Sequence, residues 1–192
     1  APRVRGHEIA GEIVEVGKKI KKYKTGQKVF VSHHVSCNEC RYCKKGYHTV
    51  CETLKKTNFD PGGFAEFIRV PEINVQFGVY VLPDEVLYDE GTFIEPLGCV
   101  ARGQRVAGIK KDDTLLIIGS GIAGFLHIKL AKARGIKKII ATDINPYRLN
   151  AAKKFGADII INAKDDVPAL VKENNNKRLA DVVILCLSLI HI

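Results

Sequence analysis

The chain has 192 residues, of which 46% are hydrophobic and 27% are charged, and its formal net charge is +9. These proportions are ordinary for a globular protein and exclude a disordered tail, a collagen-like fibre and a dense disulfide scaffold. The length suits one large domain or two small ones. The sequence shows no signal peptide and no apolar run long enough to cross a bilayer. It begins at Ala1 and contains no Met, and we therefore expect it to be a fragment of a longer protein.

The positive charge comes mostly from lysine pairs beside turns and helix ends, such as Lys18-Lys19, Lys44-Lys45 and Lys110-Lys111. A groove that follows a nucleic-acid backbone has a sustained basic stripe with aromatic residues between the charges. The sequence has no such stripe, and we interpret the charge as solvated surface charge. We expect no nucleic-acid and no membrane partner. A zinc-stabilised nucleic-acid-binding module remains as an alternative from another class.

The first half of the chain contains short apolar or alternating stretches bounded by Gly and Pro turns. This pattern is typical of an antiparallel, barrel-like β domain. The strands that we expect cover residues 13–17, 28–31, 64–70 and 79–82.

The second half contains continuous Val, Ile and Leu runs that alternate with helical patterns. Strands without a polar face indicate a parallel sheet that helices cover on both sides, so the fold class is α/β with a β-rich domain before it. The expected strands cover residues 114–118, 138–142, 158–161 and 181–185. The expected helices cover residues 122–134, 146–155 and 165–172, and a further helix over 90–107 joins the two halves.

Four cysteines follow one another as Cys37-x2-Cys40-x2-Cys43-x7-Cys51. Four thiolates in a short segment can close a tetrahedral zinc site that leaves no position open for a substrate. An iron–sulfur run would have a last spacing nearer three residues, and disulfides belong to oxidising compartments. The spacing predicts a structural zinc that stabilises residues 37–51. His48, inside this segment, is expected to be exposed.

A glycine-rich turn, Gly119-Ser120-Gly121-Ile122-Ala123-Gly124, follows a buried strand and opens a helix. In this context the glycines allow a tight turn, a close approach of a pyrophosphate and close packing of helix on strand. Asp143 ends the next strand, where a carboxylate accepts hydrogen bonds from ribose hydroxyls and repels a 2′-phosphate, which favours NAD over NADP. The expected coenzyme-binding residues are Gly119, Gly121, Ile122, Gly124, Asp143 and Arg148, although a helix-surface role for Arg148 is the commoner one.

The segment Gly6-His7-Glu8 and the dipeptide Glu95-Pro96 carry a further set of donors. A single His-Glu pair is weak evidence, because an exposed polar turn has the same sequence. Neutral imidazole is a common zinc ligand, and a carboxylate can occupy an exchangeable position beside it.

The motifs GHEIAGEIVEVG, DPGGFAEFIRVP, FIEPLG, GSGIAG and IIATD, together with the four cysteines, resemble the zinc-dependent medium-chain dehydrogenases of the alcohol dehydrogenase superfamily. The resemblance covers about residues 2–185, and the FIEPLG motif is similar to that of the sorbitol and L-threonine dehydrogenase branch. It implies a partial GroES-like catalytic domain over residues 1–97 and a partial Rossmann domain, a doubly wound parallel sheet, over residues 98–192.

The resemblance also implies a catalytic zinc held by a cysteine upstream of the GHE motif, by His7, and by Glu8 or Glu95 with a water. The implied reaction is hydride transfer between NAD and a secondary alcohol, polyol or amino-alcohol, in a cytoplasmic homodimer or homotetramer. Because the upstream cysteine is absent from this sequence, we expect residues 1–192 alone to be inactive or nearly so. A zinc-free reductase of the same superfamily is a second alternative, which His7, Glu8 and Glu95 argue against.

The remaining candidate donors are expected to have minor roles. His33 and His34 follow a strand near the cysteine segment, and we expect surface or supporting positions for them rather than ligation. Cys99 is expected to pack within a helix. The end of the chain, residues 188–192, resembles translated sequencing adapter, so we assign no function to His191.

Overall fold

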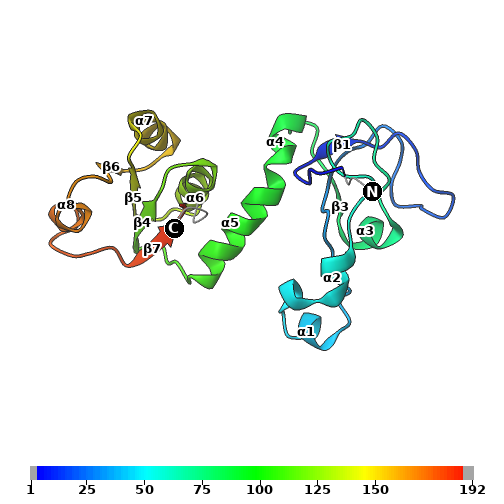
Figure 1. Ribbon diagram of the computed structural model, residues 1–192, viewed down its shortest axis with the longest axis horizontal. Helices are drawn as coiled ribbons and strands as arrows, with labels where there is room; N and C mark the ends of the chain where they lie inside the picture. The colour runs from blue at the N-terminus through cyan, green and yellow to red at the C-terminus, as the bar shows by residue number, and fades with distance from the viewer. Residues whose placement is uncertain (1–3, 188–192) are drawn as a thin grey trace. The chain divides into compact units, whose positions relative to one another are not determined.

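The computed structural model describes residues 4–187 and divides into two compact units that meet between Pro96 and Leu97 (Figure 1). The expectations for residues 188–192 lie outside the described residues. Within the described part, no helix is long and apolar enough to span a membrane.

Unit 1, which ends at Pro96, contains an antiparallel sheet of three short strands. They are β1 (Ala10–Glu12), β2 (Lys28–Val31) and β3 (Val79–Val81), in the order β1-β2-β3. Val29 and Val31 alternate along β2 and pack in a buried cluster with Tyr23 and Phe59. The predicted strands over 28–31 and 79–82 are therefore confirmed, and their inward residues form the core of this unit.

Two predicted strands of unit 1 are wrong. The strand expected at 13–17 lies earlier in the chain, as β1. Ile13 still exchanges backbone hydrogen bonds with residues 26 and 27, but Val14 is 59% exposed and is not part of a strand. The stretch 64–70 forms no strand and only an isolated bridge joins Asp60 to Arg69. Its alternating pattern has no sheet partner, and Phe64 is 82% exposed.

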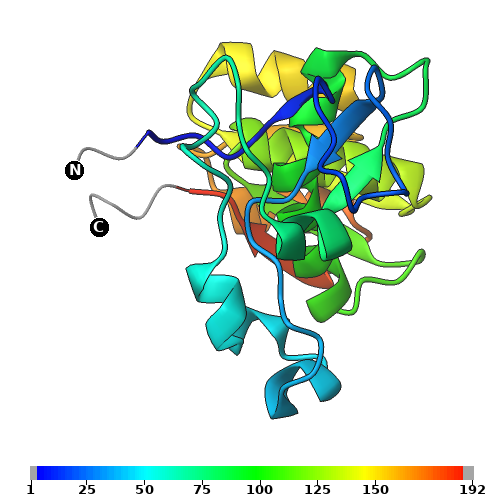
Figure 2. The same ribbon diagram turned by 90° about the vertical axis from the view of Figure 1, so that its right-hand side faces the viewer.

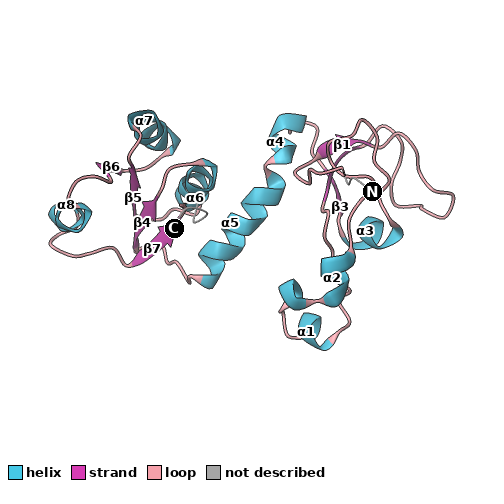
Figure 3. Ribbon diagram, viewed as in Figure 1, coloured by secondary structure: helices cyan, strands magenta, loops and turns pink. Residues whose placement is uncertain are grey.

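The described residues 4–106 contain six helical segments, and the last of them continues across the boundary into unit 2 (Figure 3). The cysteine segment contains α1 (Arg41–Lys44), the 3-10 turn η1 (His48–Val50) and α2 (Glu52–Lys56), and it projects from the sheet as a lobe in both ribbon views (Figures 1 and 2). The others are α3 (Glu72–Phe77), α4 (Tyr88–Thr92) and α5 (Ile94–Val106). The helix predicted over 90–107 is confirmed as α4 and α5, with a break at Phe93.

Unit 2, which begins at Leu97, contains a parallel sheet in the order β6-β5-β4-β7. The strands are β4 (Thr114–Ile118), β5 (Lys138–Asp143), β6 (Ile159–Asn162) and β7 (Val182–Leu185). The helices are α6 (Ile122–Ala133), α7 (Pro146–Phe155) and α8 (Val167–Asn174). Every strand and helix predicted for residues 114–185 is confirmed to within two residues at each end.

Helices cover both faces of this parallel sheet. Leu115 and Ile117 of β4 pack with Ile128 of α6 and Ala152 of α7 on one face, while Leu116 packs on the other face in the cluster that contains Val171 of α8. Two buried faces explain why the strands carry no polar alternation. The strand order reverses between β4 and β7, and such a switch point is where open α/β sheets bind ligands beyond the carboxyl ends of their strands.

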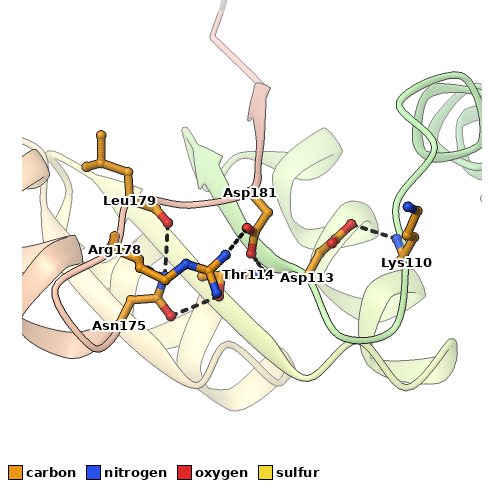
Figure 4. A network of polar contacts seen from close by, with 7 residues as sticks. All are labelled: Lys110, Asp113, Thr114, Asn175, Arg178, Leu179 and Asp181. Carbon is orange, nitrogen blue, oxygen red and sulfur yellow. Dashed lines mark hydrogen bonds and ion pairs between the residues drawn. The ribbon is translucent and has the colours of Figure 1, made fainter.

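A polar network at the amino end of β4 fastens the loop between α8 and β7 (Figure 4). Asp181 accepts a hydrogen bond from the Thr114 backbone N–H at 2.8 Å and pairs with Arg178. The buried Asn175 accepts from the Thr114 hydroxyl at 2.9 Å and donates to the Leu179 carbonyl at 3.0 Å. These contacts fix the start of the edge strand β7 beside the amino end of β4. The glycine-rich turn lies at the other end of β4.

Candidate metal and coenzyme sites

The four cysteines of residues 37–51 converge on one point. The Sγ atoms of Cys37 and Cys43 are 3.9 Å apart, those of Cys40 and Cys43 are 3.5 Å apart, and those of Cys51 and Cys37 are 3.7 Å apart. Tetrahedral zinc–thiolate bonds of about 2.3 Å place sulfur atoms about 3.8 Å from one another. The donor geometry therefore fits zinc, and the sulfur atoms are too far apart for disulfides.

The backbone prepares part of this cluster for thiolate chemistry. Hydrogen bonds from the backbone N–H groups of Cys37 and Leu54 lower the pKa of Cys51 to about 6. Burial raises the pKa of Cys43 to about 12, and a bound cation is what would stabilise its thiolate there. The predicted position of His48 is confirmed, because it is exposed on η1 and lies outside the thiol cluster.

The His7 segment is placed by backbone contacts with the turn at residues 61–64. Gly63 N–H donates to the Gly6 carbonyl and Phe64 N–H donates to the Arg5 carbonyl, both at 2.8 Å. Gly6 has a φ of +93°, and a Cβ added to it would lie 2.9 Å from the Phe64 nitrogen. A Cβ on Gly63 of the DPGG motif would in turn lie 2.7 Å from the Gly6 carbonyl carbon, so glycine at positions 6 and 63 allows the two main chains to touch.

Glu95 reaches the same region from the first turn of α5. The preceding helix α4 packs closely on the sheet, since a Cβ on Gly91 would lie 2.8 Å from the Ala10 Cβ and 2.9 Å from the Leu82 Cδ1. The Glu95 Oε2 lies 3.8 Å from the His7 Nε2, and the Glu95 side chain is only 19% exposed. The structure thus brings together two of the three residues that the family resemblance implied for the catalytic metal.

His33 completes a group that we call the three-segment site, consisting of His7, His33 and Glu95. One donor atom of each residue lies within 4.8 Å of the other two. Glu8, the remaining expected ligand, is exposed and is not part of this group. Sequence reasoning treated His33 as peripheral, because no motif connects the residue after β2 to residues 7 and 95.

The environment of His33 keeps its imidazole neutral. Burial first, and the neighbouring His34 and His7 in addition, lower the His33 pKa to about 4. A neutral imidazole offers a lone pair to a metal at pH 7. His34, by contrast, donates from Nδ1 to the Thr57 carbonyl at 2.5 Å and so helps to hold the start of the cysteine lobe.

The segments that carry His7, His33 and His34 line an open pocket of about 830 Å³, together with Asn58, Gly63 and Phe64. The size is adequate for a small organic molecule. The imidazoles of His7, His33 and His34 and the carboxylate of Glu8 are polar groups on its otherwise largely apolar wall.

Asn74 of α3 is a positioning residue that sequence reasoning missed. Its side chain is fully buried and donates to the carbonyls of Ser32 at 2.9 Å and His33 at 3.0 Å. The Ser32 N–H also donates to the Gly78 carbonyl at 2.7 Å. The available sequence signal was an Asn between two apolar residues. Its burial and its hydrogen-bond partners depend on the tertiary fold.

In unit 2 the glycine-rich turn has the shape that a dinucleotide requires. Gly119 has a φ of +96°, and a Cβ on Gly124 would lie 2.1 Å from the Gly119 carbonyl oxygen, so α6 packs directly on the turn. A Cβ on Gly121 would meet nothing within 4 Å. The space beside Gly121 and the first N–H groups of α6, which begins at Ile122, therefore form a cradle of the kind that receives a pyrophosphate.

Asp143 lies beside this turn at the end of β5. Its side chain is 6% exposed, its Oδ2 accepts from the Ser120 N–H at 2.9 Å, and its Oδ1 accepts from the Asn145 N–H at 2.8 Å. The half-exposed Arg148 places Nη1 3.9 Å from Asp143 Oδ2. The carboxylate is thus held by two backbone donors while each oxygen keeps a further lone pair.

Cys99 lies on the helix α5, as predicted, but its environment differs from the prediction. Cys99 is exposed instead of packed, because it lies on the solvent side of the helix from the buried Val100 and Gln104.

The fold and the two donor groups define a metal-binding protein with an antiparallel β unit and a dinucleotide-binding α/β unit. Two family models match the chain. The alcohol dehydrogenase GroES-like domain matches residues 1–83, and the zinc-binding dehydrogenase model matches residues 123–191. The chain belongs to the zinc-binding dehydrogenases, and the predicted combination of a GroES-like unit with a Rossmann unit is confirmed.

Relatives with assigned names belong to the same branch that the sequence motifs indicated. Sorbitol dehydrogenase of Bacillus subtilis (strain 168) is 35% identical over 184 residues, which are 94% of this chain and 51% of the relative. L-threonine 3-dehydrogenase of Chelativorans sp. (strain BNC1) is 36% identical over 166 residues, which are 86% of this chain and 47% of the relative. The chain spans about half the length of these curated relatives.

Solved structures agree with this assignment. A protein of Sinorhizobium meliloti 1021 bound to NADP superposes with a TM-score of 0.84 at 27% identity, over 96% of this chain and 54% of that one. An alcohol dehydrogenase of Escherichia coli CFT073 in complex with NADH superposes with a TM-score of 0.82 at 29% identity, over 97% of this chain and 55% of that one.

Proposed function

We propose that this chain serves zinc-dependent hydride transfer between NAD and a secondary alcohol, polyol or amino-alcohol. The observation that carries the proposal is the approach of the His7 Nε2 to the Glu95 Oε2, 3.8 Å apart, where His7 lines an open pocket. The names of the relatives, sorbitol dehydrogenase and L-threonine 3-dehydrogenase, support a polyol or amino-alcohol as the substrate class.

Each residue has a distinct part in this proposal. His7 and Glu95 hold the catalytic zinc, with Glu8 beside His7 as a further carboxylate, and Cys37, Cys40, Cys43 and Cys51 hold the structural zinc. A catalytic zinc supplies Lewis-acid chemistry, which lowers the pKa of a substrate hydroxyl. The residues that line the pocket would orient the carbinol carbon.

The coenzyme belongs to unit 2. Gly119, Gly121, Ile122 and Gly124 receive the pyrophosphate, and Asp143 accepts from the adenosine ribose hydroxyls, with Arg148 at the edge of that subsite. NAD supplies the hydride acceptor. The buried, backbone-held carboxylate of Asp143 supports NAD over NADP, because it would lie against a 2′-phosphate.

Coenzyme binding by residues 1–192 is the first test. We expect NADH to bind more tightly than NADPH by at least about 10-fold, and Asp143→Ala to abolish this preference. The measurement is the change in NADH fluorescence on titration. Absence of binding to either coenzyme in a chain with native circular dichroism would contradict the proposal.

Turnover is the second test. With residues 1–192 alone we expect little or no oxidation of sorbitol, L-threonine or 2,3-butanediol. A chimera in which residues 4–187 replace the matching segment of the Bacillus subtilis sorbitol dehydrogenase should form NADH from at least one of these alcohols. A chimera that binds zinc and NADH but oxidises none of them would refute the proposed reaction.

The remaining expectations are part of the same proposal. We propose that the whole enzyme is a cytoplasmic homodimer or homotetramer that takes a small-molecule alcohol as its partner. Size-exclusion chromatography with light scattering on the chimera measures its assembly.

A further inference from the structure

A buried polar network in unit 2 joins α5 to α6 and contains none of the proposed metal or coenzyme residues. Gln104 of α5 is 1% exposed, and His127 of α6 is 7% exposed. The Gln104 Nε2 lies 2.9 Å from the His127 carbonyl oxygen and 3.3 Å from the His127 Nδ1. The Gln104 Oε1 accepts a hydrogen bond from the Arg134 Nη1 at 3.2 Å. The proposed reaction uses none of these three residues.

The network lies on one side of α6. His127 and the C-cap residue Arg134 are seven positions apart, which is about two helical turns, so both face α5. Gly103 allows α5 to approach closely, because a Cβ on it would already lie 3.5 Å from the His127 Cε1. Lys129 belongs to the other side of α6, where it lies over the Phe155 ring of α7 at 5.8 Å from the centroid.

The orientation of the Gln104 amide is determined by two of its partners. A guanidinium can only donate hydrogen bonds and a backbone carbonyl can only accept them. The amide oxygen therefore faces Arg134, and the amide nitrogen faces the His127 carbonyl. A reversed amide would place two donors together at Arg134 and two acceptors together at the His127 carbonyl. The remaining N–H of the amide is thus directed at the His127 Nδ1.

This orientation decides the protonation state of His127. An Nδ1 atom that accepts from the amide must keep its lone pair, so the ring is neutral and carries its proton on Nε2. A proton added at Nδ1 would point at the amide N–H and would place a charge on a buried ring. In agreement with this, burial lowers the pKa of His127 below its ordinary value of 6.5.

The charged groups around the network do not offset this effect. On α5, the exposed Arg102 and Arg105 flank Gln104. Helices α5, α6 and α7 contain a single acidic residue, Glu95, which is nine positions before Gln104. The strands beneath α6 contribute apolar side chains such as Leu115 and Ile117. A proton on His127 therefore finds cations and apolar groups around it rather than a carboxylate.

We propose that His127 is a proton-sensitive switch, which holds α5 on α6 when the ring is neutral and releases α5 when the ring is protonated. The boundary between the two units falls within α5, and the residues of α5 from Leu97 onward belong to unit 2. The switch thus controls how firmly the segment that follows unit 1 is held in the coenzyme-binding unit. This inference goes beyond the proposed function and requires neither zinc nor a coenzyme.

The direction of the pH effect follows from the lowered pKa. When α5 opens, water reaches the His127 ring and the ordinary pKa of 6.5 applies. The closed state therefore has its full stability above pH 6.5 and loses stability as the pH falls from 6.5 through the lowered pKa. Mild acid should open the contact between α5 and α6.

The first experiment titrates the His127 ring nitrogens by ¹⁵N spectroscopy of the 192-residue chain. At pH 7 the wild type should carry its proton on Nε2, and its pKa should lie below 6.5. Gln104→Glu places an oxygen where the amide N–H faced Nδ1, so the proton affinity of His127 should rise at least about 10-fold. Arg105→Gln changes the net charge equally and leaves the network intact, and its effect should be less than about 3-fold.

The second experiment measures the release of α5 by hydrogen exchange of residues 97–106, corrected for the intrinsic effect of pH. From pH 7 to pH 5, protection of these amides should fall about 10-fold relative to that of β4 in the wild type. His127→Asn has a side-chain oxygen that can accept in place of Nδ1 and cannot take up a proton there. It should keep its protection at pH 5.

Three results would overturn the proposal. They are a proton on Nδ1 of the wild type at pH 7, equal wild-type protection of residues 97–106 at both pH values, and a His127 proton affinity that Gln104→Glu does not raise above that of the Arg105→Gln control. The first and third are read from the ring itself and remain decisive if His127→Asn does not fold. A folded His127→Asn variant that loses protection in acid as the wild type does would also refute the switch.

Discussion

The two candidate metal sites of unit 1 are built in opposite ways. The cysteines come from one continuous segment, residues 37–51, whereas the three-segment site draws His7, His33 and Glu95 from distant parts of the chain. Short loops between ligands cost little closure entropy, so the cysteine geometry is mostly a local matter. The three-segment geometry depends instead on the sheet, on α3 and on α4 packing against β1. A site of the first kind can be predicted from spacing, whereas a site of the second kind also needs positioning residues such as Asn74, which bonds to the backbone of His33.

The largest expected effect comes from breaking the continuous cysteine site. Cys43→Ser should remove one zinc per chain and unfold residues 37–56, because structural zinc contributes on the order of 10 kcal/mol to small zinc-stabilised folds. Limited proteolysis and zinc analysis measure the two effects. Cys99→Ser, an exposed cysteine outside the cluster, is the control and should keep both the metal and the resistance to protease. Equal resistance of both variants would contradict a stabilising role of the cluster.

The glycine-rich turn of unit 2 is also a continuous site. Substitutions at two of its glycines should separate an effect on folding stability from an effect on coenzyme binding. Gly124→Ala should destabilise unit 2 by about 3 kcal/mol, since the new Cβ would lie 2.1 Å from the Gly119 carbonyl oxygen. Gly121→Ala should cost about 1 kcal/mol or less, because its Cβ meets nothing in the folded chain, yet it should weaken NADH binding by filling the cradle. Urea unfolding measures the change in the free energy of unfolding, and NADH titration measures the change in coenzyme affinity. A destabilised Gly121→Ala variant would contradict this division.

The dependence of the three-segment site on its scaffold is tested at Asn74. Asn74→Ala leaves the buried carbonyls of Ser32 and His33 without their donor, which should cost about 2 kcal/mol of unfolding free energy. Because His33 loses its backbone anchor and packs against the His7 ring, the affinity for a zinc at His7 and Glu95 should fall by up to about 10-fold. Zinc held by the four cysteines should not change, which makes it the internal control in a chelator competition. Unchanged affinity for zinc at His7 and Glu95 would show that this site does not depend on Asn74.

The smallest effect is expected in the network that fastens β7, far in sequence from both metal sites. The Thr114 N–H first, and the Arg178 charge in addition, hold the pKa of Asp181 below its ordinary value of 3.8. A depressed carboxyl pKa stabilises the fold fully above the unfolded pKa, and this contribution is lost as the pH falls from about 4 through the folded pKa. Asp181→Asn should lower the thermal midpoint by a few degrees at pH 7 and have almost no effect near pH 2. Thermal unfolding across this pH range measures the difference, and an equal shift at both pH values would contradict the electrostatic origin.

Most of what could be predicted about unit 2 came from sequence patterns that extend over only a few residues. The continuous apolar strands, the Pro residue that opens α7 and the Gly156 that ends it, with a φ of +115°, all act within a few residues of one another. The stretch 64–70 shows the limit of such reasoning in unit 1. Its alternation matches a strand, but the neighbouring turn bonds to residues 5 and 6, and among the described residues the stretch makes only the isolated bridge between Asp60 and Arg69. Periodicity reports which residues alternate and does not report whether a partner strand exists.

The sequence by itself determined the four-cysteine cluster, the glycine-rich turn with its acidic partner Asp143, and the parallel sheet. Each of these rests on spacing along the chain, because ligands or turns within one segment are brought together by local geometry. Only the tertiary structure decided that His33 joins His7 and Glu95, and that Asn74 holds it there. Those contacts arise where β2 and α3 pack around one core and α4, which precedes Glu95, packs on β1 and β2. The free energy of that packing is distributed over many residues that no motif includes.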